Sequence, residues 1–517
     1  MSQYLYTYAA RGIQEFVLRG DKLKEMVGAS ELIEELSTTV LDHTLKALNL
    51  PHKIISQAAG AARILFNSKD DAMRLAALWP MIVHHTAPGL QVVQAIVEAD
   101  TNIFAAVANA EKQLTVERNL LYPDLPNAGA FTRRCPRTGK PAVAFDDAEP
   151  LDIEAHTKRQ FSSRKRIAQI LDPDATLRWP DDFIQIAGRD NAYLAVIHAD
   201  GNAFGKMFIR LQQASETLPV PADLYVQLCR SITHITQSAV QQAVKKMCPT
   251  PSLFPGRILI LAGDDVTAVV RADKAIEFTQ ELLTAFSNVS REHLARLNKD
   301  KSLPLPEQLT ATAGIAFVKK SYPFVQAYRL SESLCTFAKN SFKQLDSPPA
   351  ALAFHRITTS TTSHNFKDII DDELTANGVC LTMMPYLVVP YGSSSSPLLK
   401  NLLSLTEAAQ NLPRGKLRTL LTDFYESQPK VERDFQRMIT IARKSANNSG
   451  NNSNPADMFC RALHALTGAE NLITSCKKSP IADIITLAHI QRAEERRATD
   501  DDNSDEVQSH DTRTHFL

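Results

Sequence analysis

Three aspartates lie beside apolar segments that are suited to buried strands. Asp200 follows the run YLAVI at 193–197, and Asp264 and Asp265 lie between the two apolar halves of ILILAGDDVTAVV, residues 258–270. Burying a carboxylate costs free energy unless a positive charge compensates it. Mg²⁺ and Mn²⁺ prefer oxygen ligands and supply that charge. The three aspartates therefore predict a divalent-cation site.

The segment 258–270 is typical of a tight hairpin inside a sheet, with Gly-Asp-Asp at the turn. If a strand over 192–199 lies beside this hairpin, Asp200 leaves its end at the same edge as Asp264 and Asp265. We therefore expect the three carboxylates to converge. Because side chains alternate between the faces of a strand, the sequence leaves open whether Asp264 and Asp265 both bind metal.

Two glycines after the first aspartate suggest a close approach to phosphate. Gly201 and Gly205 allow a sharp turn without a Cβ in the way, and Lys206 could meet phosphate charge. The stretch is not a Walker A loop, because only three residues separate the glycines and Met207 stands where a metal-binding hydroxyl is required.

The composition is that of a globular protein with several domains. The 517 residues suggest roughly three domains. No apolar run approaches the roughly 20 residues that span a bilayer, so we expect no membrane insertion. The N-terminus lacks the pattern of a secretory signal, which predicts a cytoplasmic protein.

Cysteines and charge exclude several function classes. The seven cysteines are scattered and never form a C-x-x-C pair, which argues against a disulfide framework and a four-cysteine zinc site. Lys plus Arg and Asp plus Glu number 57 each, so any nucleic-acid contact has to be local.

The order of elements along the chain predicts five regions. Residues 1–120 alternate strands (3–9, 61–66, 89–98) and helices (21–49, 70–79), as in a small α+β unit. Residues 121–190 are rich in proline and predict a connector or insert, in which Cys135 resembles a degenerate zinc knuckle without partners.

Regular alternation returns in the second half. The patterns predict strands at 192–199, 257–262, 266–271, 309–318 and 351–357 and helices at 221–247, 273–297 and 323–340, within a unit at 191–360. After 385 the strand signal disappears and helical periodicity dominates, so 361–492 predicts a helical domain. Residues 447–455 read as a flexible loop, and 493–517 as a disordered acidic tail.

These motifs together resemble the large-subunit palm polymerase family of type III CRISPR effector complexes, the oligoadenylate-making nucleotidyl cyclases. The family carries an aspartate-glycine segment and a GGDD hairpin, matched here by ADGN at 199–202 and AGDD at 262–265. The segment 310–339 resembles its later strand and helix. Residues 13–36 and 58–66 resemble its first palm, which lacks the acidic hairpin, and 383–391 with the following helices resembles its C-terminal domain.

The resemblance implies an α+β fold with two ferredoxin-like palm domains, antiparallel sheets with helices on one face, and a C-terminal helical domain. Ala262 replaces the first glycine of the doublet, and the N-terminal HD nuclease domain of many members is not recognisable. Asp42-His43 is an HD dipeptide in a helical stretch without further ligands around it. Single-strand DNA cleavage is therefore not expected.

The resemblance also implies the chemistry. Two Mg²⁺ or Mn²⁺ ions on Asp200, Asp264 and Asp265 would bridge the triphosphate of ATP and activate the ribose hydroxyl of a second nucleotide. The product would be a linear or cyclic oligonucleotide second messenger in antiviral signalling. The implied nucleotide-binding residues are Gly201, Asn202, Gly205, Lys206, Gly263 and Lys339.

Two other functions remain open at this stage. The chain could be a silent scaffold that binds guide RNA or CRISPR subunits, or a diguanylate-cyclase-like enzyme, although Asp265-Val266 departs from the usual Glu-Phe. The sequence decides neither the base that is used nor whether the active pocket needs a homodimer. A templated polymerase is disfavoured by the neutral net charge.

Overall fold

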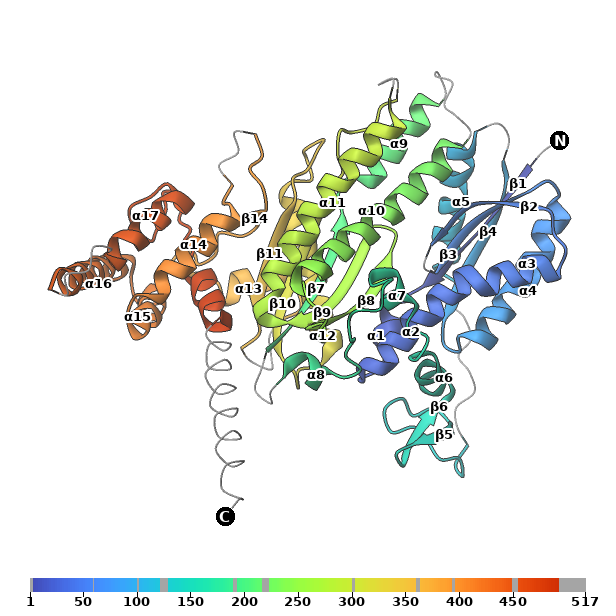
Figure 1. Ribbon diagram of the computed structural model, residues 1–517, viewed down its shortest axis with the longest axis horizontal. Helices are drawn as coiled ribbons and strands as arrows, with labels where there is room; N and C mark the ends of the chain where they lie inside the picture. Colours follow the sequence, from blue (N-terminus) through green and yellow to red (C-terminus); the bar gives the residue numbers. More distant parts are fainter. Residues whose placement is uncertain are drawn as a thin grey trace, which may run out of the picture.

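The computed structural model describes residues 3–58, 60–99, 102–120, 129–188, 193–215, 223–299, 303–358, 363–392, 396–448 and 454–491. Figure 1 shows two sheet-containing units side by side, a small insert next to the first unit, and a group of helices at the far end of the second. Within the described residues, no helix has the length and apolarity needed to cross a membrane.

The first unit has the ferredoxin-like strand order β2-β3-β1-β4, with every pair antiparallel. Aromatic and apolar side chains of β1, such as Tyr6 and Tyr8, are buried in the core. Its elements are β1 (Gln3–Arg11), α1 (Ile13–Leu18), α2 (Leu23–Glu35), a π-helical turn (Leu36–Val40), α3 (Leu41–Ala47), β2 (His52–Ala58), β3 (Ala61–Phe66), α4 (Lys69–Thr86), β4 (Gln91–Ala99) and α5 (Ile103–Glu117).

Three elements of this unit, α1, β2 and α5, were not predicted. The strand β2, with the sequence HKIISQA, is mostly exposed or half-buried along one edge of the sheet, so it lacks the alternation that marks a strand. The helix α5 packs against the second unit, where Phe104 meets Tyr225 edge to face at 5.4 Å between ring centroids. The two units therefore share buried side chains.

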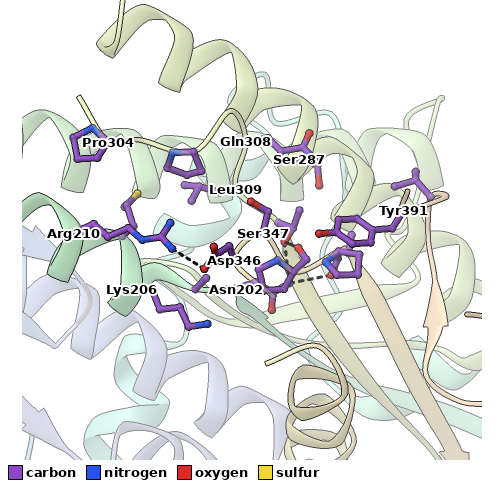
Figure 2. A pocket seen from close by; sticks show the side chains of 18 of the residues that line it. Asn202, Lys206, Arg210, Ser287, Pro304, Gln308, Leu309, Asp346, Ser347 and Tyr391 are labelled. Carbon is purple, nitrogen blue, oxygen red and sulfur yellow. Dashed lines mark hydrogen bonds and ion pairs between the residues drawn. The ribbon is translucent and has the colours of Figure 1, made fainter. Parts of the chain in front are cut away.

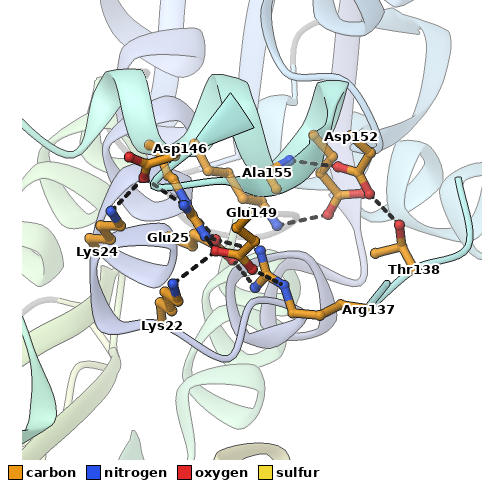
Figure 3. Close-up of polar contacts among 12 residues, drawn as sticks. Lys22, Lys24, Glu25, Arg137, Thr138, Asp146, Glu149, Asp152 and Ala155 are labelled. Carbon is orange, nitrogen blue, oxygen red and sulfur yellow. Dashed lines mark hydrogen bonds and ion pairs between the residues drawn. The ribbon is translucent and has the colours of Figure 1, made fainter. Parts of the chain in front are cut away.

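The described part of the insert, residues 129–188, is folded rather than loose. It contains β5 (Ala142–Asp146), β6 (Glu149–Asp152), α6 (Ile153–Phe161), α7 (Arg166–Leu171) and α8 (Phe183–Ala187). The helix α6 crosses α2 so closely that a Cβ on Gly28 would lie 1.7 Å from the carbonyl oxygen of Lys158. Figure 3 shows the charged cluster beside this crossing, in which Glu25, 1% exposed, binds both Arg137 and Arg159.

The second unit repeats the order of the first and extends it. Its six-stranded sheet has the order β14-β11-β10-β7-β9-β8, in which β10-β7-β9-β8 corresponds to β4-β1-β3-β2. The strand β11 is parallel to β10, and β14 is antiparallel to β11. The elements are β7 (Tyr193–Gly201), α9 (Phe204–Ala214), α10 (Leu224–Met247), β8 (Gly256–Ala262), β9 (Asp265–Arg271), a 3₁₀ turn (Ala272–Lys274), α11 (Ala275–Leu297), β10 (Ala311–Lys319), α12 (Phe324–Ser341), β11 (Ala351–Arg356) and β14 (Tyr386–Leu387).

The prediction that strands end before residue 385 was wrong, because β14 completes this sheet. Two residues are too few to produce a periodic pattern. The helix over 481–491 holds this segment in place: Asp483, 2% exposed, accepts hydrogen bonds from the hydroxyls of Thr382 and Tyr386 and from the backbone N–H of Met383.

The remaining described C-terminal part is mostly helical, with one short hairpin of β12 and β13. It comprises α13 (Phe366–Asp372), β12 (Thr375–Ala376), β13 (Val379–Cys380), α14 (Leu399–Gln410), α15 (Arg414–Phe424), α16 (Gln428–Asn448), α17 (Pro455–Thr467) and the helix 481–491. The predicted tail 493–517 lies outside the described residues, and so does 449–453 of the predicted loop. The fold is α+β with two palm-type units and a helical C-terminal region, as the sequence predicted.

Candidate active site

The predicted hairpin is present, and its turn lies at the end of β7. The strands β8 and β9 pair so that Ala262 faces Asp265, which leaves Gly263 and Asp264 as the turn. Gly263 has a φ of 61°, a left-handed conformation that favours glycine. The neighbouring register pairs Ala199 with Val266. Asp200, the next residue of β7, therefore lies at the same sheet edge as the turn.

The three aspartates converge. Asp200, Asp264 and Asp265 each offer a carboxylate oxygen within 4.8 Å of the others, and all three residues are half-buried. Burial, then the negative charge of Asp200, raises the pKa of Asp264 to about 6 and that of Asp265 to about 8. Both pKa shifts therefore reflect burial first and the neighbouring carboxylates second, and the Lys339 charge offsets only part of them.

The donor set fits Mg²⁺ or Mn²⁺. All three candidate ligands are carboxylates, which are hard oxygen donors, and they approach one another as closely as the ligands of one or two such ions. Both Asp264 and Asp265 take part in this approach, so the alternation of side chains does not remove either of them from the cluster.

The helix α12 lies over the face of the sheet that carries Asp200. Gly314 of β10, which is opposite His198 of β7, makes this possible: a Cβ there would lie 2.0 Å from the carbonyl oxygen of Ser331. From the last turn of α12, the Lys339 ammonium forms an ion pair with the Asp200 carboxylate. Lys339, predicted as a nucleotide-binding residue, is thus brought to the aspartates themselves.

Further side chains between α12 and the face of the sheet that carries Asp200 were not predicted as site residues. His198 lies two positions before Asp200, on the same face of β7, and its ring meets Tyr328 of α12 edge to face at 5.6 Å between centroids. Burial lowers the pKa of His198 to about 4, so its imidazole is neutral at pH 7. Tyr328 is 4% exposed, and its hydroxyl has no hydrogen-bond partner among the described residues.

Glu332 of α12 also lies near Asp200. Burial and, after it, the negative charge of Asp200 raise the pKa of Glu332. The positions 328, 332 and 339 follow helical spacing, which is a signal that the sequence contained. Relating that spacing to the aspartates requires knowing that α12 covers this particular face.

The remaining predicted residues have different surroundings. Gly201 has no room for a side chain, because a Cβ would lie 2.0 Å from the ring of Phe204 and 2.7 Å from a carboxylate oxygen of Asp264. Asn202 is 4% exposed and hydrogen-bonds to the hydroxyls of Thr310 and Thr312. Gly205, at the start of α9, faces open space.

Lys206 lies in a pocket that begins at Asn202, two residues after Asp200 in the chain (Figure 2). Asn202, Lys206 and Arg210 line one part of the pocket, and the proline-containing segments 304–310 and 346–350 with Tyr391 line the rest. The Lys206 ammonium donates to the carbonyl oxygens of Lys343 and Leu345 at 2.9 and 3.3 Å, and Arg210 pairs with Asp346 at 2.7 Å.

The first unit keeps the architecture without the acidic groups. The pair Ala58–Ala61 in the β2–β3 hairpin corresponds to the pair Ala262–Asp265 in the β8–β9 hairpin. Gly60, which precedes Ala61, has a φ of 77°. Ala9, opposite Ala61 in β1, occupies the position of Asp200. Because none of these residues carries a carboxylate, the acidic chemistry belongs to the second unit.

A ferredoxin-like sheet with carboxylates at the end of its first strand and at its central hairpin defines a palm domain. Residues 193–345 match the family model Cas10/Cmr2, second palm domain. For this segment, the match confirms the family that the motifs indicated, the Cas10-like palm polymerases of type III CRISPR complexes. No curated protein sequence matches the chain significantly.

Several solved structures are similar to this chain at low sequence identity. Csm1 of T. onnurineus is 14% identical with a TM-score of 0.50, and the alignment covers 95% of this chain and 69% of Csm1. A Csm1-Csm4 cassette in complex with cA4 is 13% identical with a TM-score of 0.48, covering 94% and 70%. A Csm1-Csm4 cassette in complex with AMPPNP is 16% identical with a TM-score of 0.41. The alignment covers 67% of this chain and 55% of the matched chain's length.

Proposed function

We propose that this protein is a metal-dependent nucleotidyltransferase that joins ATP into a linear or cyclic oligoadenylate, a second messenger of antiviral signalling. One observation carries the proposal: the three aspartates converge within 4.8 Å in a segment that matches the Cas10/Cmr2 second palm. The family resemblance supports ATP as the substrate, whereas the base preference is left to experiment.

The side chains have separate tasks in this proposal. Asp200, Asp264 and Asp265 would hold Mg²⁺ or Mn²⁺, which supplies positive charge for the triphosphate and lowers the pKa of a bound ribose hydroxyl. Gly263 leaves the backbone open at this edge, Gly201 leaves room for the Asp264 carboxylate, and Lys339 can offer its ammonium to phosphate oxygens. The protein chiefly positions and neutralises the reacting groups.

In this proposal, the pocket that begins at Asn202 takes part of the nucleotide. It carries Lys206 and Arg210 on one side. Lys206 would exchange its two carbonyl acceptors for phosphate oxygens, and Arg210 would exchange Asp346 for them. Tyr391 and the prolines provide apolar surface for a base or a ribose.

The test incubates purified protein with each NTP, singly and in pairs, with Mn²⁺ or Mg²⁺. Pyrophosphate release and mass spectrometry of the products are the measurements. We expect an adenylate product from the wild type and none from Asp264→Asn combined with Asp265→Asn. The matched control is Asp174→Asn, which removes an exposed carboxylate of the insert. Product formation by the double variant would refute the assignment.

A second candidate is a scaffold subunit that binds guide RNA or CRISPR partner subunits without turnover. The absence of acidic groups from the corresponding described positions of the first unit favours a purely structural role for that unit. RNA that co-purifies with a protein unable to consume ATP would support this candidate. A guanylate product from GTP would instead support the diguanylate-cyclase-like function.

A further inference from the structure

Lys339 occupies the side of the acidic cluster where a cation is needed. Among the described residues, it is the positively charged side chain that pairs with any of the three aspartates. Its own side chain is 27% exposed and that of Asp200 is 31% exposed, so the pair lies at the mouth of the cluster. Three carboxylates with one ammonium leave a net charge of about −2 when all groups are ionised.

We propose that Lys339 is a built-in counterion that occupies a cation position of this cluster and is displaced when a divalent ion binds. The proposal rests on the proposed function, because it takes the three aspartates as the metal site. In the protein without metal, the ammonium offsets part of the repulsion among the carboxylates. A divalent ion that binds Asp200 competes for the oxygen that holds the ammonium.

The backbone around Lys339 is held while its side chain is able to move. Close contact at Gly314 and the hydrogen bond from the Cys335 thiol to the carbonyl oxygen of Thr312, at 3.2 Å, hold α12 on the sheet. Lys339 stands in the last turn of this helix, and its flexible side chain reaches solvent. Displacement therefore requires rotation of one side chain and leaves the helix in place.

This arrangement gives Lys339 two successive partners. Without metal it neutralises Asp200. After displacement, the free ammonium would be available to the phosphates of a bound nucleotide. The same charge thus stabilises the acidic cluster in one state and the nucleotide in the other. The cost is a weaker affinity for the metal ion by itself, because the ion has to replace a favourable ion pair.

Mn²⁺ binding without nucleotide tests the proposal, measured by calorimetry and by electron paramagnetic resonance of free Mn²⁺. Lys339→Met removes the charge and keeps the length. It should bind Mn²⁺ about tenfold more tightly than the wild type, because an adjacent cation typically changes the proton affinity of a carboxylate by about tenfold or more. Lys339→Arg keeps the charge and should stay close to the wild type. Lys343→Met, an exposed lysine four residues further on, is the matched control and should also stay close to the wild type.

Thermal unfolding provides a second readout. In EDTA, Lys339→Met should melt below the wild type, because the carboxylates lose their counterion, and saturating Mn²⁺ should raise its melting temperature more than that of the wild type. A variant that melts at the wild-type temperature in EDTA would overturn the counterion role.

Unchanged or weaker Mn²⁺ affinity in Lys339→Met would also overturn the inference: unchanged affinity means that the lysine does not compete, and weaker affinity means that it supports the metal ligands. These outcomes are distinct from failure of the proposed function. That failure would appear as no NTP turnover by the wild type, whatever the order of the Mn²⁺ affinities.

Discussion

Replacing Gly314 by alanine tests whether the close contact between α12 and the sheet positions the site. The new Cβ would lie 2.0 Å from the carbonyl oxygen of Ser331 and 2.5 Å from the backbone nitrogen of Cys335. Both are main-chain atoms of α12, so no side-chain rotation relieves the clash. The helix has to move away from β10.

The size of this movement follows from the contact. Real Cβ atoms essentially never approach another atom closer than 3.0 Å, so the 2.0 Å contact requires a shift of about 1 Å. Overpacking of this kind typically costs about 1–3 kcal/mol. For a unit of this size, that corresponds to a fall in melting temperature of about 2–12 °C. The shift also carries Lys339 away from Asp200.

Tryptophan fluorescence can follow the unfolding of the region beside the second unit. The chain has two tryptophans, of which Trp79 is in the first unit and Trp179 packs on Phe254 beside the second. In a Trp79→Phe background, the emission therefore reports on the region beside β8. Gly205→Ala is the matched control, because its Cβ meets nothing within 4 Å and it lies in α9, where alanine is favoured by about 0.5–1 kcal/mol.

We expect Gly314→Ala to melt earlier and to lose NTP turnover, while Gly205→Ala melts at or above the wild-type temperature. If Gly314→Ala instead kept the wild-type melting temperature and activity, α12 would be free to adjust. The reasoning that this helix holds Lys339 in place would then be wrong.

Two further predictions concern charge. Without divalent ions, stability should fall as the pH rises from about 4 to about 8, because the raised pKa values of Asp264 and Asp265 keep protons on the folded state that the unfolded chain has released. Melting temperatures of the wild type minus those of the double Asp→Asn variant should show this slope, and a difference independent of pH would contradict it. In the insert, Arg159→Met should cost about 2 kcal/mol, less than the usual loss of a buried pair because Arg137 still neutralises Glu25. Limited proteolysis should then cut the insert faster than in Arg164→Met, an exposed control; equal rates would show that the cluster does not hold the insert.

Local patterns predicted much of the second unit. The predicted strands 257–262 and 266–271 differ by one residue at most from β8 and β9, and the predicted helix 323–340 by one residue from α12. Buried strands with apolar runs and long amphipathic helices carry their signal within a few neighbouring residues. The polar edge strand β2 and the two-residue strand β14 carry no such signal, which is why they were not predicted.

The folded insert shows a second limit. Its position depends on pairs such as Glu25 with Arg159, which are 134 residues apart in the chain. A proline-rich composition predicted a connector, because nothing local indicates that these charges are buried together.

The sequence by itself determined that carboxylates stand at the end of one strand and in one hairpin, since both are local facts. It predicted their convergence only on the condition that β7 and β9 are neighbours, which the sheet order satisfies. The tertiary structure alone decided that Lys339, 139 residues from Asp200, pairs with it and that Tyr328 and Glu332 lie over the same edge. The physical reason is that the face on which a helix packs depends on the contacts of the whole core, and no local periodicity encodes those contacts.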